Sequence, residues 1–237
     1  MPDTEIVAIR ALLTSRPRPV GADERRQRLD EFGRALGQPD DARLTPIAIG
    51  DVPAEWSTTP QADAHRAVLY LHGGGYMAGS IVSHRYIAVE IGRAARARTL
   101  ALGYRLAPEH PYPAQLDDAL AAYQHLREQG LAPEAIAVGG DSAGGNLVLS
   151  LLLALRDRGL PLPACGWLIS PWTDLTASGA TMESKTSVDL AALSTGTGAG
   201  VCRRHRVHGP ADLATVRRPR RTAAASDPGG IRRDLAR

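Results

Sequence analysis

The sequence of 237 residues contains little cysteine and no long apolar run. Its two cysteines, Cys165 and Cys202, cannot build a disulfide framework, so we expect free thiols in a reducing compartment. The N-terminal segment MPDTEIVAIR carries acids and lacks an apolar signal core, and no later run reaches the length of a membrane span. We therefore expect a soluble, cytoplasmic protein with no membrane partner.

Basic residues are concentrated near the C-terminus. Residues 203–237 hold ten arginines against three acids, whereas the residues before them carry more acids than bases. A basic tail on an acidic body can indicate an arm that binds nucleic acid. This tail has no periodicity that would give an ordered basic face, so we expect no nucleic-acid partner.

The order of the predicted elements indicates the fold class. Residues 4–15 and 22–37 have helical spacing and predict an N-terminal helical cap over residues 1–40. Residues 44–60 alternate like one or two exposed strands. The apolar run 66–72 predicts a strand buried on both faces. Helices and strands then alternate: helix 83–97, strand 99–104, helix 114–129, strand 135–141, helix 143–158 and strand 165–170. This βαβα order predicts an α/β fold with a doubly wound, mostly parallel sheet.

A candidate nucleophile lies in the motif GDSAGG (140–145). The motif places Ser142 between an apolar strand and an apolar-periodic helix, which is the context of a nucleophile elbow. Side chains at 140 and 144 would collide with neighbouring backbone in such a turn, which explains both glycines. The alternative is a glycine-rich turn whose serine only caps the helix. The flanking strand and helix favour the nucleophile.

A second glycine-rich segment, HGGGYMAGS (72–80), directly follows the buried strand. An α/β-hydrolase places the loop that completes its oxyanion hole at this position. Three glycines let backbone amides approach a tetrahedral intermediate closely. The alternatives are a flexible turn and a phosphate-binding loop, but no Lys-Ser/Thr pair follows the glycines as a phosphate-binding loop requires.

Four motifs in this order resemble the hormone-sensitive-lipase-like family of bacterial esterases: HGGGY (72–76), YRLAPEHPYPAQLDD (104–118), GDSAGGNL (140–147) and SPWTDL (170–175). The lead-in VPAEWSTTP is most similar to the branch of lactone hydrolases and acetyl hydrolases. The resemblance implies the α/β-hydrolase fold, with an N-terminal cap over residues 1–40 and a partial core over residues 41–189.

The resemblance also implies an activity and a site. We expect a serine carboxylic ester hydrolase that acts on short acyl esters or lactones, with no metal and no cofactor. Ser142 would attack the carbonyl, and the amides of Gly74, Gly75 and Ala143 would form the oxyanion hole. His72 would brace the loop without taking part in the chemistry.

A serine hydroxyl needs a base to take its proton, and that base needs an acid to orient it. The order in this fold is serine, acid, histidine. The candidates His84, His110 and His125 precede the serine and are misplaced for this role. Asp189 comes too early for the acid, and His205 and His208 lie in the arginine-rich tail. We therefore expect the chain as given to lack both partners and to be a weak hydrolase; the alternative is a pseudoenzyme or small-molecule binder.

Two further pairs of residues have two interpretations each. Asp117 and Asp118 lie in the early turns of a helix, where carboxylates suit the helix dipole, and this structural interpretation is preferred over a catalytic one. Tyr76 and Trp172 either line an acyl pocket or serve as core or rim aromatics.

Residues 190–237 have no sustained period, and we assign them no structure. We interpret them as a frameshifted reading of the family's C-terminal part. Codons for residues 208–237, read one base later, permit an unbroken stretch that ends in SDEILLD and resembles the acid-bearing segment of the family. The slip would fall between Val188 and Val201. The nucleotide sequence tests this: a shifted frame without the family pattern, or with a stop before a histidine codon, would contradict it.

Overall fold

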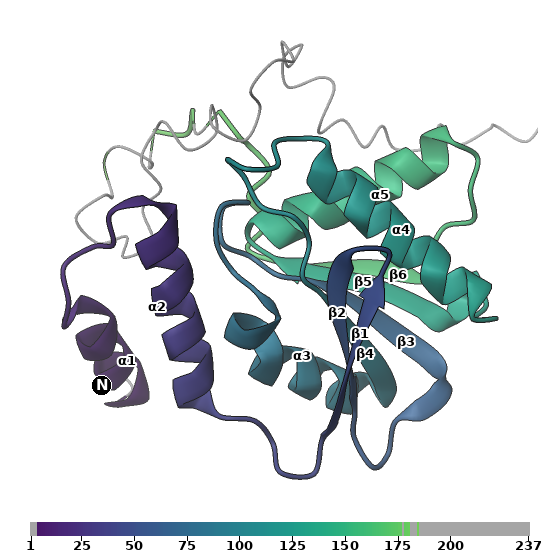
Figure 1. Cartoon of the computed structure of the whole chain (residues 1–237), viewed down its shortest axis with the longest axis horizontal. Coiled ribbons are helices and arrows are strands. Elements are labelled where there is room, and N and C mark those ends of the chain that lie inside the picture. The colour runs from purple at the N-terminus through teal and green to yellow at the C-terminus, as the bar shows by residue number, and fades with distance from the viewer. Residues whose placement is uncertain (1–3, 177, 181–183, 185–237) are drawn as a thin grey trace, which may run out of the picture.

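A six-stranded sheet with helices on both faces forms the body of the computed structural model, which describes residues 4–176, 178–180 and 184 (Figure 1). The helices are α1 (Thr4–Thr14), α2 (Gly21–Leu36), α3 (Ile81–Ala95), α4 (Ala114–Glu128) and α5 (Ala143–Asp157), with a 3-10 turn η1 (Pro133–Ala135). The strands are β1 (Arg43–Ile49), β2 (Val52–Thr58), β3 (Asp63–Leu71), β4 (Ala97–Leu102), β5 (Ile136–Asp141) and β6 (Cys165–Ile169).

The sheet has the order β1-β2-β4-β3-β5-β6. The pairs β3/β4, β3/β5 and β5/β6 are parallel, and β1/β2 and β2/β4 are antiparallel. This arrangement confirms the mostly parallel α/β sheet. Among the strands that the structure describes, β6 lies at one edge.

Helices cover both faces of the sheet. Figure 1 shows α3 on one face and α4 with α5 on the other. Along β3, the side chains of Leu69 and Leu71 are fully buried in the large core shared with α4 and α5, while Tyr70 packs in the smaller cluster against α3. The alternation of side chains along a strand explains how the continuous apolar run of β3 serves both cores.

The helix α2 packs on α3 at the N-terminal end of the chain. The two helices approach closely at Gly33, where an added Cβ would lie 2.4 Å from the Val82 carbonyl oxygen. Helix α3 begins two residues earlier than its apolar pattern predicts, because Ser80 and Ser83 cap it reciprocally through side chain and backbone.

The prediction of exposed strands over residues 44–60 is wrong for β2. Ala54 and Trp56 are buried, and so is Glu55 between them. β2 is an interior strand between β1 and β4, so both of its edges are hydrogen-bonded, and α3 packs against it. The charge of Glu55 is compatible with burial because Arg85 of α3 donates two hydrogen bonds to its carboxylate, at 2.8 and 2.9 Å.

The interpretation of residues 190–237 as structureless and frameshifted falls outside the described residues. In the part of the chain that is described, no helix has both the length and the apolar character needed to span a bilayer.

Candidate active site

Ser142 sits in the turn that joins β5 to α5 and has backbone angles of φ 51° and ψ −116°. A positive φ in a residue with a Cβ is strained by about 1–3 kcal/mol, and such strain gathers at functional sites. Hydrogen bonds from both sides hold the turn: the Ser142 amide donates to the Ile169 carbonyl (2.9 Å), and the Trp172 amide donates to the Ser142 carbonyl (2.8 Å). The segment that follows β6 therefore fixes the strained serine.

Close backbone packing explains the two glycines of the motif. A Cβ added at Gly144 would lie 2.0 Å from the Leu71 carbonyl oxygen and 2.5 Å from that of His72. A Cβ at Gly140 would lie 2.4 Å from the Leu71 oxygen. The collisions expected from the sequence are thus confirmed, and they occur against the end of β3.

The glycine-rich loop 72–80 begins where β3 ends, beside the serine. β3 and β5 are parallel neighbours, with Leu71 in register with Gly140, so the segments after both strands emerge at the same edge of the sheet. Gly74 and Gly75 have φ values of 120° and 66°, which favour glycine. At Gly74 an added Cβ would also lie 2.2 Å from the Ala78 carbonyl oxygen.

The amides expected to form the oxyanion hole belong to this edge. Among the described residues, none accepts a hydrogen bond from the Gly74 or Gly75 amide. Ala143 is the first residue of α5, where backbone amides have no partner within the helix. The fold thus brings together the loop carrying Gly74 and Gly75 and the turn carrying Ser142 and Ala143.

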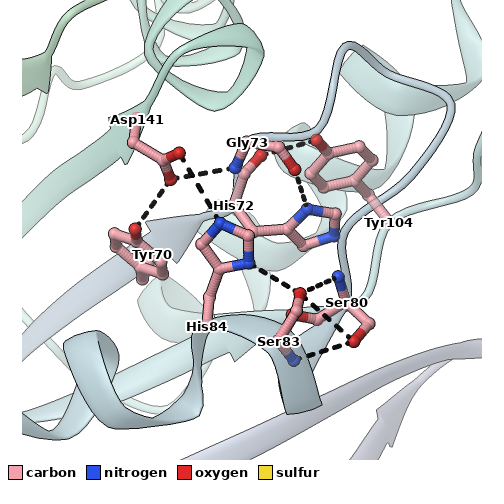
Figure 2. A network of polar contacts seen from close by, with 8 residues as sticks. All are labelled: Tyr70, His72, Gly73, Ser80, Ser83, His84, Tyr104 and Asp141. Carbon is pink, nitrogen blue, oxygen red and sulfur yellow. Dashed lines mark hydrogen bonds and ion pairs between the residues drawn. The ribbon is translucent and has the colours of Figure 1, made fainter. Parts of the chain in front are cut away.

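Asp141, the residue before the serine, ties these two segments together (Figure 2). Its Oδ1 accepts hydrogen bonds from the Gly73 amide (2.9 Å) and the Tyr70 hydroxyl (2.8 Å). Its Oδ2 faces Nε2 of His84 on α3 at 3.6 Å. The other ring nitrogen of His84 contacts the Ser83 hydroxyl at 2.8 Å. One carboxylate therefore connects the glycine-rich loop 72–80, the turn that carries Ser142 and α3.

The protonation of Asp141 follows from these contacts. Burial alone would raise the pKa of the carboxyl, but His84, the Tyr70 hydroxyl and the Gly73 amide together hold that pKa below its usual value. The group is an anion at neutral pH, which is the form that accepts hydrogen bonds on both oxygens. Burial and the adjacent anion raise the pKa of Tyr70, so its phenol remains a donor.

His72 lies at the base of the loop and is buried. Its Nδ1 is 2.8 Å from the Gly73 carbonyl oxygen, and its ring stacks on Tyr104 with centroids 4.2 Å apart. The Tyr104 hydroxyl donates to the His72 carbonyl (2.6 Å). Burial, with a smaller contribution from His84, lowers the pKa of His72 to about 3. A neutral ring packed in this way fits a brace for the loop.

The remaining sequence candidates lie apart from Ser142 or in other roles. The His125 ring contacts Gln129 on the surface of α4, and the His110 carbonyl accepts from Gln115. The catalytic candidates Asp189, His205 and His208 fall outside the described residues. No described residue forms a hydrogen bond with the Ser142 hydroxyl.

Asp118 and Tyr76 have structural partners. Asp118 is buried and accepts from the backbone amide and the guanidinium of Arg105. The Tyr76 hydroxyl donates to Asn146 in the first turn of α5 (2.6 Å). Trp172 packs against the main core, and its buried Nε1 has no acceptor within the described part of the chain.

The sequence gives no role to Asp141, and His84 comes before the serine, which is the wrong position for the catalytic base. The position of His84 does not exclude a role in holding another residue in place. No local pattern reveals the contact between them, because it depends on how α3 packs on the sheet against β3 and β4.

We expect Asp141→Ala to lower the free energy of unfolding by about 1–3 kcal/mol, because the Gly73 amide and the Tyr70 hydroxyl would lose their acceptor in a buried setting. Asp141→Asn keeps an oxygen acceptor and should cost less. Urea unfolding of both variants, with Tyr70→Phe as a control for the phenol bond alone, measures the difference. An alanine variant no less stable than the asparagine variant would contradict the assignment.

The family model described as the alpha/beta hydrolase fold matches residues 68–220, and the chain belongs to that family. A frameshift between Val188 and Val201 would be expected to end the match near Val201, but the match extends to residue 220. The frameshift therefore stays a prediction.

Within that fold, the resemblance to hormone-sensitive-lipase-like esterases is confirmed. The chain is 44% identical over 161 residues to an acetyl-hydrolase of Streptomyces hygroscopicus, covering 68% of this chain and 52% of that relative. It is 35% identical over 148 residues to an esterase of Acinetobacter venetianus, covering 62% and 48%. The crystal structure of an esterase from the bacterial hormone-sensitive lipase family superposes with a TM-score of 0.80 at 36% identity, over 89% of this chain and 71% of that one. The chain spans about half the length of the curated relatives it matches.

Proposed function

We propose that this chain carries the nucleophile and oxyanion hole of a serine carboxylic ester hydrolase for short acyl esters or lactones. The observation that carries the proposal is the strained Ser142, with φ 51°, held beside the glycine loop at one edge of the sheet. The names of the relatives, acetyl-hydrolase and esterase, support an ester substrate. The helical segment 1–40 would form a cap beside the core 41–189.

The chemistry follows from the placement of these groups. The Ser142 hydroxyl oxygen attacks the ester carbonyl carbon, and its proton passes to a base. The carbonyl oxygen becomes an anion that accepts hydrogen bonds from the Gly74, Gly75 and Ala143 amides, and each such donor contributes roughly 10²- to 10³-fold in rate. The oxyanion then re-forms the carbonyl as the carbon–oxygen bond to the alcohol breaks, and the base returns its proton to the departing alcohol oxygen. This leaves an acyl ester on Ser142. Water releases the acid, and in a lactone the alcohol remains attached to the acyl chain.

Acylation of Ser142 needs a base that takes the proton of its hydroxyl. In the part of the chain that the structure describes, no group is hydrogen-bonded to the Ser142 hydroxyl, so none is placed to take its proton. Free imidazole in solution can supply the base if the nucleophile and the oxyanion amides are in place. Acylation of the serine therefore tests the proposal more directly than turnover does.

We expect p-nitrophenyl acetate to transfer an acetyl group to Ser142, faster when imidazole is added. Mass spectrometry of the peptide containing residue 142, from the wild type and from Ser142→Ala, measures the adduct, and release of p-nitrophenol gives its rate. Subtracting the rate with Ser142→Ala removes the reaction of imidazole with the ester in solution. An absence of Ser142-dependent adduct with and without imidazole would overturn the proposal.

The lack of a base at Ser142 among the described residues favours one alternative function, a small-molecule binder without turnover. The same experiment separates the two. A binder would be stabilised against unfolding by short esters or lactones and would form no acyl adduct.

A further inference from the structure

The cap helix α2 reaches the oxyanion loop through one side chain, Arg26. Its Nε donates to the Met77 carbonyl oxygen (2.7 Å), and one terminal nitrogen donates to the Ala107 carbonyl oxygen (3.0 Å). Both terminal nitrogens also bind the Glu109 carboxylate, at 2.9 and 2.7 Å. The planar guanidinium thus joins the cap to two loops at once, an arrangement that the single ammonium group of lysine cannot reproduce.

The Met77 carbonyl is connected to the proposed oxyanion donors by two peptide units. The Met77 carbonyl and the Ala78 amide belong to one planar peptide. The Ala78 amide donates to the Gly74 carbonyl (3.0 Å). The Gly74 carbonyl and the Gly75 amide belong to another planar peptide. The direction of the Gly75 N–H is therefore coupled to the orientation of the peptide that Arg26 holds.

Backbone contacts also hold this loop: the Ala107 amide donates to the Tyr76 carbonyl (2.8 Å), and the Met77 amide donates to the Gly74 carbonyl (3.3 Å). The Gly73 amide is held from the opposite side by Asp141. On the cap side, the Ser80 hydroxyl donates to Asp30 of α2 (2.5 Å) at the end of the loop. Gly74 and Gly75 have no side chains that could resist rotation of their peptides. Arg26 is the contact from α2 that lies within the turn itself.

We propose that Arg26 is a positioning residue that sets the direction of the Gly75 amide through the Met77–Ala78 and Gly74–Gly75 peptides. The inference rests on the proposed function for its catalytic consequence, but the coupling itself concerns only the loop. Glu109 supports Arg26 by holding its guanidinium in the plane that reaches both carbonyls. Arg26 therefore acts through the backbone and touches no reacting atom.

Arg28 provides a matched control. It lies on the same helix, is similarly buried, and pairs with Glu24 and the Pro17 carbonyl inside the cap, away from the loop. Arg26→Met and Arg28→Met each remove a guanidinium and keep most of the aliphatic stem. Only the first is expected to alter the loop.

Hydrogen–deuterium exchange of the full-length chain gives the first measurement. We expect Arg26→Met to raise the exchange rate of the peptide covering residues 73–80 about tenfold, with little change in the peptides of β5 and α5, and Arg28→Met to leave residues 73–80 unchanged. Glu109→Gln, which keeps an acceptor for Arg26, should give a smaller increase. If Arg26→Met unfolds, Arg26→Lys serves instead, since it keeps the charge and one hydrogen bond. Equal exchange of residues 73–80 in the Arg26 and Arg28 variants would overturn the proposal.

The kinetics of Ser142 acylation give the second measurement. Misdirecting one of several oxyanion donors should slow acylation at saturating p-nitrophenyl ester by about 10-fold, less than the roughly 10²- to 10³-fold that follows removal of a donor. The ester concentration at half-saturation should stay the same, because the ground-state ester does not use the hole fully. An Arg26 variant with faster loop exchange but unaltered acylation would overturn the positioning role. If the wild type forms no acyl adduct, the proposed function fails, and the exchange result still decides the coupling.

Discussion

Gly144→Ala is expected to lower the free energy of unfolding by about 3 kcal/mol or more, at the upper end of the overpacking range. The added Cβ would lie 2.0 Å from the Leu71 carbonyl oxygen and 2.5 Å from that of His72. Both oxygens belong to backbone at the end of an interior strand, so neither can move aside as a side chain would. Since small domains are stable by only about 5–15 kcal/mol, a large part of the population would be unfolded at moderate urea.

Gly166→Ala on the edge strand β6 is the matched control. Its added Cβ would meet only side-chain methyl groups, of Leu152 at 2.8 Å and Val148 at 3.4 Å. These side chains can change rotamer, so we expect a loss of about 1 kcal/mol or less. Urea unfolding followed by circular dichroism compares the two variants. A Gly144→Ala protein within about 0.5 kcal/mol of the control would show that the loop and the turn can separate without loss of the fold.

The turn that carries Ser142 could be predicted because its signals are local. An apolar strand, two glycines around Ser142 and an apolar-periodic helix follow one another in the sequence, and the structure places β5 and α5 where they were expected. The same holds for the loop after β3. In both segments the glycines and the apolar residues are required by the backbone conformation of the segment itself.

Contacts between residues far apart in the chain could not be predicted from the sequence. The prediction that the strand around Glu55 is exposed was wrong. The alternation of apolar and polar residues does not show that Arg85 of α3 neutralises the buried Glu55 carboxylate. The contact of His84 with Asp141 and that of Arg26 with Met77 join residues more than fifty positions apart. An arginine on a polar helix face looks the same in sequence whether it meets water or a carbonyl group.

The protonation of His72 leads to a large effect of acid on stability. Its ring is buried, and because the Gly73 carbonyl oxygen can only accept, Nδ1 must carry the single proton of the neutral ring. Burial first, and the neighbouring His84 second, lower the pKa of His72 to about 3, although the Gly73 carbonyl and Asp141 act in the opposite direction. In the unfolded chain the pKa of histidine is about 6.5.

The sign of the effect follows from these two pKa values. Above about pH 6.5 both states hold a neutral ring, and the packing of His72 contributes its full stability. As the pH falls below that value, the unfolded state takes up a proton that the folded state does not, until the pH approaches the folded pKa of about 3. The free energy of unfolding should therefore fall by up to about 1.4 kcal/mol per pH unit between about pH 6 and pH 4.

His72→Asn isolates this contribution, because its amide can donate to the Gly73 carbonyl without titrating. We expect the variant to be less stable than the wild type at about pH 8, where the lost stacking on Tyr104 dominates, and to approach the wild type as the pH falls. Urea unfolding at about pH 8, 6.5 and 5 measures the two slopes, in a range where Asp141 stays ionised because its pKa lies below the usual value. All other ionisable groups are common to both proteins, so the difference between the two slopes reports His72. Parallel slopes would mean that the folded protein accommodates a protonated ring at position 72. The need for a neutral brace could not then explain why a histidine lies at the base of the loop.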